Sequence, residues 1–518
     1  MQLRHLRLAG VALLLAAPAR PSPLLAPFKP GLAFVAEKST LGVAELYAAD
    51  LEGTQTVKLS GTLVTGGNVT NFAISPNRKL VAFVADKDHD EIFELYVVPF
   101  TGGEPTKVSG DLVVGGDIDA FLWAPDGKRI VYRADQDEND IDELYVATVD
   151  GQPPVKVSGP LIDSGQVTAF SWAPNSKRLA FRADANDPGV NELFAVDPDG
   201  SDRTTLNGPL VADGDVISFS WSPKSTEVLY RADEETDETA ELFVVRADGT
   251  HHRKVSGPLV AGGDVSGSHW SPNGTRILYV ADQDTDEVLE AYVVRPDGTH
   301  NVKVSGPMVT GGDIVSIFEW SSNGSRILYR ADQEVDGANG LWVSTPDGKK
   351  NVRVTPDLVP GGSVSNADWS PKGTKIQYRG DPESVDVIEG FTVRQDGKQH
   401  TKISGALVMG GDVGIVHWSP NGQRVSYLAD QDTDGVSELW VVRHDGKGRT
   451  KVSAPQVAGG KVFTTSWPRT GSRIVYTAEQ QTVGVREIYT SKLDGTGNVK
   501  VSGSLVGGST GMMFLEVP

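Results

Sequence analysis

The sequence repeats itself with a period of 49 residues. A glutamate that opens an apolar run marks almost every copy, and a tryptophan followed by a turn, such as Trp172 or Trp418, keeps the same step. The first marker occurs at Glu45, Glu94, Glu143, Glu192, Glu241, Glu290, Gly340, Glu389, Glu438 and Glu487, with one step of 50 residues into Gly340. A unit of such an array buries its apolar face only against its neighbours. We therefore expect ten copies of one structural unit in residues 31–518.

Each copy holds four strand-sized apolar runs separated by turn residues. In the ninth copy these runs are 413–418, 424–428, 438–442 and 450–453. An Asn-Gly pair lies between the first two runs and an Asp-Gly pair between the last two, and both pairs tolerate the positive φ of tight hairpin turns. The pattern shows no 3.6-residue period of the kind that indicates a helical array. It predicts an all-β fold, namely a β-propeller of ten four-stranded antiparallel blades.

Ring closure can be predicted from the two ends of the array. Residues 32–36 begin the first copy and match the second strand of later copies, so this copy lacks a first strand of its own. Residues 511–517 follow the tenth copy at the point where a first strand is due. We expect them to complete the first blade and close a single ring, although propellers usually have about 4–8 blades. The alternative is two smaller propellers, which would require a second closing exchange near residue 270.

The repeat resembles a known family. The segment from Trp418 to Gly422 reads Trp-Ser-Pro-Asn-Gly, and a strand, an acidic loop and the Leu-Trp-Val-Val run of 439–442 follow it. This order is similar to that of the TolB-like, WD-repeat-like β-propeller family. The resemblance implies the propeller fold, whose blades serve as binding platforms, as Tol-Pal components, and as domains of peptidases and lyases. Tol-Pal members carry a separate N-terminal α/β domain, for which we expect no counterpart here.

The N-terminus predicts export. Arg4 and Arg7 precede the apolar run 8–16, and Ala17-Pro18-Ala19 offers the small-residue pattern of a signal-peptide cleavage site. The run is shorter than the ~20 residues that cross a bilayer, so we expect no membrane span. We therefore expect a signal peptide at 1–19 and a proline-rich leader at 20–30. The mature protein is expected to be periplasmic or secreted, because the predicted signal peptide directs export and the chain has no cysteine for lipid attachment.

Charge limits the partners that we expect. The formal net charge is −20, so the phosphates of nucleic acid would be repelled. The acidic loops and the loops between blades should emerge on one face of the ring, with the tight hairpins on the other. We expect a monomer that binds a protein or peptide of the cell envelope.

The acidic loop before the third strand raises the question of a metal. In the ninth copy, alternate acids and a glycine resemble the calcium loops of integrin α-chain propellers, and calcium prefers six to eight oxygen ligands. The candidate calcium ligands are Asp430, Asp432, Asp434 and Glu438 in copy nine, Asp282, Asp284, Asp286 and Glu290 in copy six, and Asp86, Asp88, Asp90 and Glu94 in copy two. The alternative is a solvated or salt-bridged loop, in which Arg133, Arg182, Arg231 and Arg330 pair with the acids.

Motifs that indicate catalysis are sparse. A Gly-x-Ser-x-Gly match at 507–511 falls on a loop between blades, with no α/β-hydrolase domain after it. His269 and His417 occupy equivalent places beside a tryptophan and could face the central channel. We expect a non-catalytic exported binding scaffold, with calcium as its one candidate cofactor. The alternative function is a propeller-type hydrolase or polysaccharide lyase that uses the channel. The repeated tryptophans are expected to pack between neighbouring blades.

Overall fold

The computed structural model describes residues 28–162, 164–506 and 512–516. All regular secondary structure in these residues is β-strand, with 40 strands and no helix. It follows that no described segment forms a helix with the length and apolarity that a membrane span requires. The predicted signal peptide and residues 20–27 of the predicted leader lie outside the described residues.

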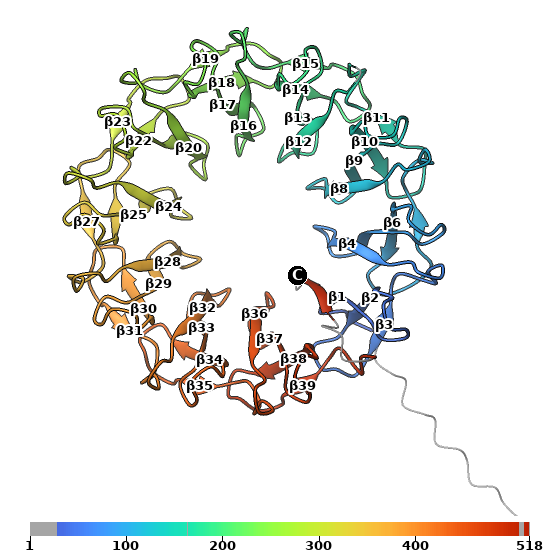
Figure 1. Cartoon of the computed structure of the whole chain (residues 1–518), viewed down its shortest axis with the longest axis vertical. Helices are drawn as coiled ribbons and strands as arrows, with labels where there is room; N and C mark the ends of the chain where they lie inside the picture. Colours follow the sequence, from blue (N-terminus) through green and yellow to red (C-terminus); the bar gives the residue numbers. More distant parts are fainter. Residues whose placement is uncertain (1–27, 163, 507–511, 517–518) are drawn as a thin grey trace, which may run out of the picture.

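The strands form ten four-stranded antiparallel sheets that stand as blades around one axis (Figure 1). In order of blades 1 to 10, the first and innermost strands are β40 (Met512–Glu516), β4 (Val69–Ile74), β8 (Ile118–Trp123), β12 (Val167–Trp172), β16 (Val216–Trp221), β20 (Val265–Trp270), β24 (Ile314–Trp320), β28 (Val364–Trp369), β32 (Val413–Trp418) and β36 (Val462–Ser466). The second strands are β1 (Leu32–Ala36), β5 (Leu80–Ala85), β9 (Arg129–Ala134), β13 (Leu179–Ala183), β17 (Glu227–Ala232), β21 (Ile277–Ala281), β25 (Ile327–Ala331), β29 (Lys375–Gly380), β33 (Arg424–Ala429) and β37 (Arg473–Ala478).

The third and fourth strands complete each blade toward the outside of the ring. The third strands are β2 (Glu45–Ala49), β6 (Glu94–Pro99), β10 (Glu143–Thr148), β14 (Glu192–Val196), β18 (Glu241–Arg246), β22 (Glu290–Val294), β26 (Gly340–Ser344), β30 (Glu389–Arg394), β34 (Glu438–Arg443) and β38 (Glu487–Lys492). The fourth strands are β3 (Thr56–Lys58), β7 (Thr106–Lys107), β11 (Val155–Lys156), β15 (Thr204–Thr205), β19 (Arg253–Lys254), β23 (Val302–Lys303), β27 (Asn351–Arg353), β31 (Thr401–Lys402), β35 (Thr450–Lys451) and β39 (Val499–Lys500).

A strand from the C-terminal end of the chain closes the ring. Blade 1 has the order β3-β2-β1-β40, and Val35 of β1 is in register with Phe514 of β40. The single ring of ten blades is therefore confirmed. The alternative of two smaller propellers is wrong, because blades 5 and 6, on either side of residue 264, are complete sheets of consecutive strands. Residues 511 and 517 of the predicted closing segment lie outside the described residues.

Strand bounds in the ninth blade follow the sequence pattern closely. β32 is the predicted run 413–418, and β33 and β34 each extend one residue further than predicted. The fourth strand is shorter, because the backbone N–H groups of Val452 and Ser453 both donate to the carbonyl oxygen of Leu439, at 2.8 and 3.4 Å. The chain leaves the ladder at that point toward the next blade. Gly422 has φ of 68°, as the tight hairpin between β32 and β33 requires.

The core lies in the seams between blades rather than inside any one blade. At the closing seam, Leu32 and Phe34 of blade 1 pack against Val475 and Ile488 of blade 10. The indole N–H of Trp172 in blade 4 donates to the carbonyl oxygen of Leu122 in blade 3, at 3.3 Å. The prediction that the tryptophans pack between blades is confirmed. Because apolar area is buried at the seams, each blade depends on its neighbours.

The two faces of the ring carry different loops. The loops between second and third strands lie beside the loops that join blades, since a Cβ at Gly410 would meet the carboxylate of Asp434. We call this the acidic face. The hairpins between first and second strands, and those between third and fourth strands, form the opposite hairpin face. Neighbouring hairpins touch there, and a Cβ at Gly127 would lie 2.7 Å from the side-chain nitrogen of Asn77.

Candidate functional site

The first acid of each candidate calcium set holds its own loop in shape. One carboxylate oxygen of Asp430 accepts the backbone N–H of Asp412 at 2.5 Å, and the other accepts that of Gly435 at 3.1 Å. Asp86 and Asp282 make the equivalent pair of bonds in their blades. A carboxylate that accepts two backbone N–H groups satisfies donors that the tight loop would otherwise leave unpaired.

The glycine of the calcium-like pattern has a conformational role. Gly435 has φ of 73°, and its equivalents Glu91 and Glu287 have φ of 62° and 60°. The loop therefore needs a left-handed residue at this position in every copy, and glycine adopts it without strain. The Asp-Gly spacing is explained by the turn itself.

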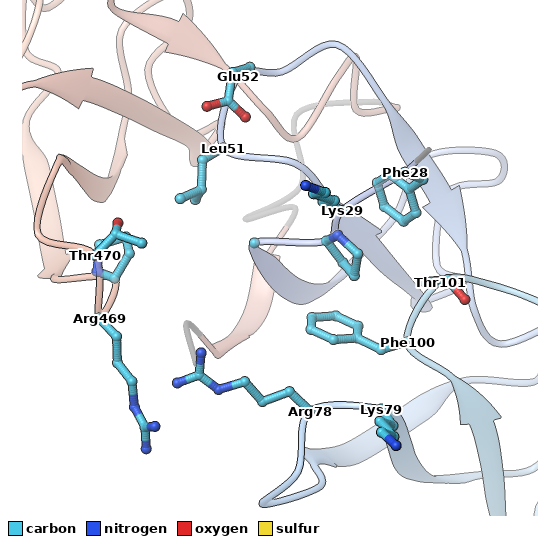
Figure 2. A pocket seen from close by; sticks show the side chains of 13 residues that line it. Phe28, Lys29, Leu51, Glu52, Arg78, Lys79, Phe100, Thr101, Arg469 and Thr470 are labelled. Carbon is cyan, nitrogen blue, oxygen red and sulfur yellow. The ribbon is translucent and has the colours of Figure 1, made fainter. Parts of the chain in front are cut away.

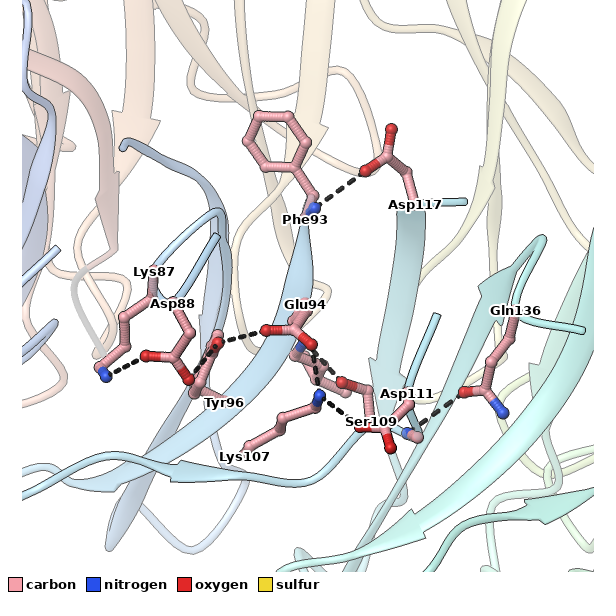
Figure 3. A network of polar contacts seen from close by, with 12 residues as sticks. Lys87, Asp88, Phe93, Glu94, Tyr96, Lys107, Ser109, Asp111, Asp117 and Gln136 are labelled. Carbon is pink, nitrogen blue, oxygen red and sulfur yellow. Dashed lines mark hydrogen bonds and ion pairs between the residues drawn. The ribbon is translucent and has the colours of Figure 1, made fainter. Parts of the chain in front are cut away.

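The last acid of each set forms a buried ion pair within its blade (Figure 3). In blade 2, Glu94 is paired with Lys107 of β7 and accepts the hydroxyl of Tyr96 at 2.7 Å. The glutamate side chain is only 5% exposed, whereas the lysine is 29% exposed. The same pairing recurs as Lys58–Glu45, Lys107–Glu94, Lys156–Glu143, Lys254–Glu241, Lys303–Glu290, Lys402–Glu389, Lys451–Glu438 and Lys500–Glu487.

The same lysine also reaches the second acid of the set. The Lys451 ammonium lies 2.8 Å from Asp432 and 2.5 Å from Glu438, and its hydrogen bond lowers the pKa of Asp432. Lys303 likewise lies 3.6 Å from Asp284 and pairs with Glu290. The cation between these two carboxylates is thus the lysine side chain. In blade 2, Asp88 pairs instead with Lys87, at 2.8 Å.

The third acid of each set is free. Asp90, Asp286 and Asp434 are exposed, and none of them makes a hydrogen bond or ion pair with the residues that the structure describes. Within this part of the chain, no group of three or more His, Asp or Glu side chains is placed to hold a metal. The fold therefore divides each candidate set among a loop-holding acid, two lysine-bound acids and one free acid.

Calcium binding at these loops stays a prediction. Titration of chelator-treated protein with calcium measures it through heat release and through the melting temperature. Because Lys451 competes for Asp432 and Glu438, we expect Lys451→Met to bind calcium more tightly than the wild type does. Absence of heat with both proteins would contradict calcium binding in blade 9.

A tyrosine hydroxyl satisfies the glutamate in some blades, and two blades that lack this hydroxyl leave a glutamate oxygen unpaired among the described residues. Tyr145 donates to Glu143 at 2.8 Å, but Phe243 stands at the equivalent place in blade 5, and one buried oxygen of Glu241 has no partner within the described part of the chain. In blade 9, Trp440 stands at this place, and one buried oxygen of Glu438 likewise has no partner among the described residues. Burial raises the pKa of Glu438. Unpaired buried oxygens of this kind cost stability.

We predict that Phe243→Tyr stabilises the protein by about 1 kcal/mol, because the new hydroxyl can donate to the unpaired oxygen of Glu241. The matched change Tyr145→Phe should destabilise by a similar amount. Melting temperatures of the two variants measure both effects. A Phe243→Tyr variant less stable than the wild type would show that the site has no room for the hydroxyl.

An aspartate that the sequence patterns had not singled out joins neighbouring blades. Asp117, just before β8, accepts the backbone N–H of Phe93 in blade 2 at 2.8 Å (Figure 3). Asp412 does the same for Ile388, at 2.7 Å. The sequence signal is the Gly-Gly-Asp that ends four of the loops between blades, at Asp117, Asp264, Asp313 and Asp412. These acids are structural.

The predicted ladder between arginines and loop acids takes another form. Arg231 and Arg330 donate to the carbonyl oxygens of Val265 and Val364 in the following blade, at 2.9 and 2.7 Å. Arg182 makes the same kind of bond, to Ile217. Arg133 does so too and also pairs with Asp119. The guanidinium groups therefore link blades mainly through the backbone.

The exposed carboxylates of these loops, some of them paired with lysine or arginine and others free, form an arc over blades 2 to 9 on the acidic face, which we call the acidic arc. Its members are Asp88, Asp90, Glu91, Asp137, Glu138, Asp140, Asp187, Glu235, Asp237, Glu238, Asp284, Asp286, Glu287, Glu334, Asp336, Glu383, Asp386, Asp432 and Asp434. At the closure, exposed Leu41 of blade 1 and Val483 of blade 10 stand in the equivalent loops. The negative charge is therefore continuous over eight blades and ends at the closing seam.

A row of titratable side chains lies on four consecutive innermost strands. His269, Glu319, Asp368 and His417 each precede the tryptophan that ends the strand, and all four are exposed. Sequence reasoning found the two histidines but missed the two acids, although their shared place before the tryptophan was visible. Partial loss of hydration within the ring raises the pKa of Asp368 and lowers that of His417. The row offers hydrogen-bonding groups to the inside of the ring.

Comparison with known proteins identifies relatives of the fold. The family model described as the lipoprotein LpqB β-propeller domain matches residues 45–265 and 146–346, which together exceed half of the chain. No curated protein matches the sequence.

Among solved structures, dipeptidyl peptidase 4 of Porphyromonas gingivalis has a TM-score of 0.51 at 13% identity, over 81% of this chain and 64% of the peptidase. This chain thus spans less than two thirds of the peptidase. A putative TolB from Agrobacterium tumefaciens has a TM-score of 0.28 at 17% identity, over 48% and 83% of the two chains. An oligogalacturonate lyase from Vibrio parahaemolyticus has a TM-score of 0.36 at 13% identity, over 70% and 96%.

These structures correct one expectation from the sequence. We expected a non-catalytic protein because catalytic motifs are sparse, yet a structure with a similar fold, at a TM-score of 0.51, is that of a peptidase. The sparseness of motifs in one chain is therefore no ground for excluding catalysis, since propeller enzymes can draw their reacting groups from several blades or from another domain. The likeness to the peptidase shows the fold alone and assigns no activity to this chain.

Proposed function

Because the chain belongs to the family of the lipoprotein LpqB β-propeller domain, we propose that it is an envelope-associated scaffold that binds a basic protein or peptide. The observation that carries this proposal is the acidic arc. Blades 2 to 9 each present exposed carboxylates on the same face of one ring. The family name and the predicted signal peptide support a place in the cell envelope.

The arc suits a partner with an extended basic surface. Its free acids, such as Asp90, Asp286 and Asp434, are exposed and have no ion-pair partner among the described residues, so they are accessible to a partner. Each exposed ion pair contributes only about 0.2–1 kcal/mol, so useful affinity requires several contacts at once. Repetition of one loop around the ring supplies such contacts, and a field of one sign also speeds the encounter with a partner of opposite charge.

Binding of a fluorescent lysine-rich peptide tests the proposal. The triple variant Asp90→Asn, Asp286→Asn, Asp434→Asn should bind the peptide about three- to tenfold more weakly than the wild type. The matched control neutralises three exposed acids of the hairpin face, Asp199→Asn, Asp248→Asn and Asp297→Asn, and removes the same total charge. An asparagine oxygen can still accept the backbone N–H that each of these three acids accepts in its turn.

Comparing the two triple variants distinguishes binding at the acidic face from a general attraction of the peptide to an acidic protein. Equal weakening by the two triple variants would overturn the proposal. Cross-linking in a native envelope extract, read by mass spectrometry, then asks where natural partners lie. We expect the cross-links to map to the acidic face of blades 2 to 9, and a concentration of cross-links on the hairpin face would contradict the assignment.

A further inference from the structure

The circle of hairpins on the hairpin face is interrupted at blade 1. In blades 2 to 10, one hairpin joins the first strand to the second, whereas β40 and β1 of blade 1 come from opposite ends of the chain. Each hairpin meets the preceding one: the backbone N–H of Asp126 donates to the Ser176 hydroxyl at 2.9 Å, and that of Asn175 to the Ser225 hydroxyl at 3.0 Å. Among the residues that the structure describes, the hairpin of blade 2 has no such neighbour before it.

A cavity of about 620 Å³ lies at this interruption, between blades 10, 1 and 2 (Figure 2). We call it the closure cavity. The side chain of Arg78 extends into it from the blade 2 hairpin, toward the blade 10 hairpin that carries Arg469. Phe100, which is almost fully buried, and Phe28 give the cavity an aromatic wall. A cavity of this size can hold a small organic molecule.

The charge of the closure cavity is opposite to that of the protein. Lys29, Arg78, Lys79 and Arg469 line it, and Glu52 is its one carboxylate. None of these five groups forms a salt bridge with the residues that the structure describes. A chain with a net charge of −20 thus gathers four unpaired cations around one opening. Such a concentration of positive charge favours an anion.

Arg78 lies at a hairpin position that is glycine or serine in blades 3 to 10. Its φ is 58°, in the left-handed region where a side chain costs free energy. The equivalent residues of blades 3 to 10 are Gly127, Ser176, Ser225, Gly274, Gly324, Gly373, Gly422 and Gly471, and all share this backbone conformation. At Gly373 a Cβ would already lie 3.0 Å from Ser321 of the preceding hairpin. Blade 2 has space for a long side chain here, because no hairpin of the described residues precedes its own.

The guanidinium of Arg78 is also incompletely satisfied. Its Nη2 nitrogen is buried and has no hydrogen-bond partner among the residues that the structure describes. A buried donor without a partner is unfavourable, and a charged one more so. Arg78 therefore combines a strained backbone with an unpaired buried nitrogen, and it adjoins a cavity. An anionic oxygen in the cavity would accept a hydrogen bond from this nitrogen.

We propose that the closure cavity is a binding site for a small organic anion. Arg78 holds the carboxylate or phosphate group of the ligand, since a guanidinium matches the geometry of both. Arg469 and the two lysines add positive charge, and the apolar part of the ligand packs against Phe100 and Phe28. This site lies on the face opposite to the acidic arc and takes a ligand of opposite charge.

Calorimetric titration of the full-length protein with simple probes tests the proposal. Phenyl phosphate and benzoate combine an anionic group with an aromatic ring, whereas inorganic phosphate and benzyl alcohol each supply one of the two. We expect saturable binding of phenyl phosphate or benzoate, with the tighter of the two identifying the anionic group that the site prefers. Inorganic phosphate and benzyl alcohol should bind more weakly.

Arg78→Gly is the decisive variant. Glycine is the residue that most other hairpins use here, so the variant should keep or raise the melting temperature while its affinity for the probe falls about tenfold or more. Lys128→Gln, on the adjacent hairpin of blade 3, is the matched control and should bind as the wild type does. Absence of saturable binding by either aromatic anion, or unchanged affinity in Arg78→Gly, would overturn the proposal.

Discussion

Removal of residues 511–518 is expected to lower the melting temperature of the protein by about 5–10 °C. The deletion takes away β40, which pairs with four residues of β1. Lost backbone hydrogen bonds contribute about 0.5–1.5 kcal/mol each, and the inner edge of a strand that holds the fully buried Phe34 and Val35 becomes accessible to water. The loss should total about 5 kcal/mol. It should shift the melting temperature less per kcal/mol than in a small domain, because the unfolding entropy grows with chain length.

Complementation makes this test specific to ring closure. A synthetic peptide of residues 511–518, added to the truncated protein, can pair with the vacant edge of β1 as an added strand. We expect it to recover part of the lost melting temperature, whereas a scrambled peptide should not. An unchanged melting temperature after truncation would show that the seam between blades 1 and 10 holds the ring without β40.

Much of this architecture could be predicted because the information is local and repeated. A 49-residue period, with turns at fixed places, predicts the blade, and the missing first strand of the first copy predicts its completion by the C-terminal segment. The strands fall where β-branched and aromatic runs alternate with Asn-Gly and Asp-Gly turns. Neither observation needs knowledge of contacts between distant residues.

The roles of the loop acids were harder to predict, because they depend on side chains from elsewhere in the blade. Asp430, Asp432 and Asp434 alternate in one loop, which suggested that they converge. The fold instead brings in Lys451, which lies 13 residues after Glu438 on the fourth strand. The same offset separates Glu94 from Lys107 and recurs in eight blades, so the pairing could have been found by searching at the repeat spacing. The spacing along the sequence would not have shown that one lysine binds two carboxylates.

The arginine at the ring closure could not be recognised without the structure. In the sequence, Arg78 follows a turn and resembles an ordinary basic hairpin residue. Its importance arises from two facts of geometry, namely a left-handed backbone and the absence of the hairpin that would otherwise fill the space beside it.

The buried ion pairs lead to the second large effect. Lys107→Met should destabilise the protein by about 2–4 kcal/mol, because it leaves the buried carboxylate of Glu94 without its cation. The value lies toward the low end of the range for fully buried pairs, since Lys107 is itself partly exposed. Tyr96 still donates a hydrogen bond to Glu94, but a neutral hydroxyl compensates a charge poorly. Differential scanning calorimetry at neutral pH measures the loss.

Two further variants separate the charge from the methylene packing of the lysine. The double variant Glu94→Gln, Lys107→Met removes both charges, and its glutamine can still accept the hydroxyl of Tyr96. Replacing both members of a buried pair costs far less than removing one, so we expect the double variant to recover most of the stability that Lys107→Met loses. Lys128→Met, on the exposed hairpin of blade 3, should leave stability unchanged. If the double variant were as unstable as Lys107→Met, the lysine would stabilise blade 2 through its alkyl chain, and the pair that recurs in eight blades would contribute little through its charge.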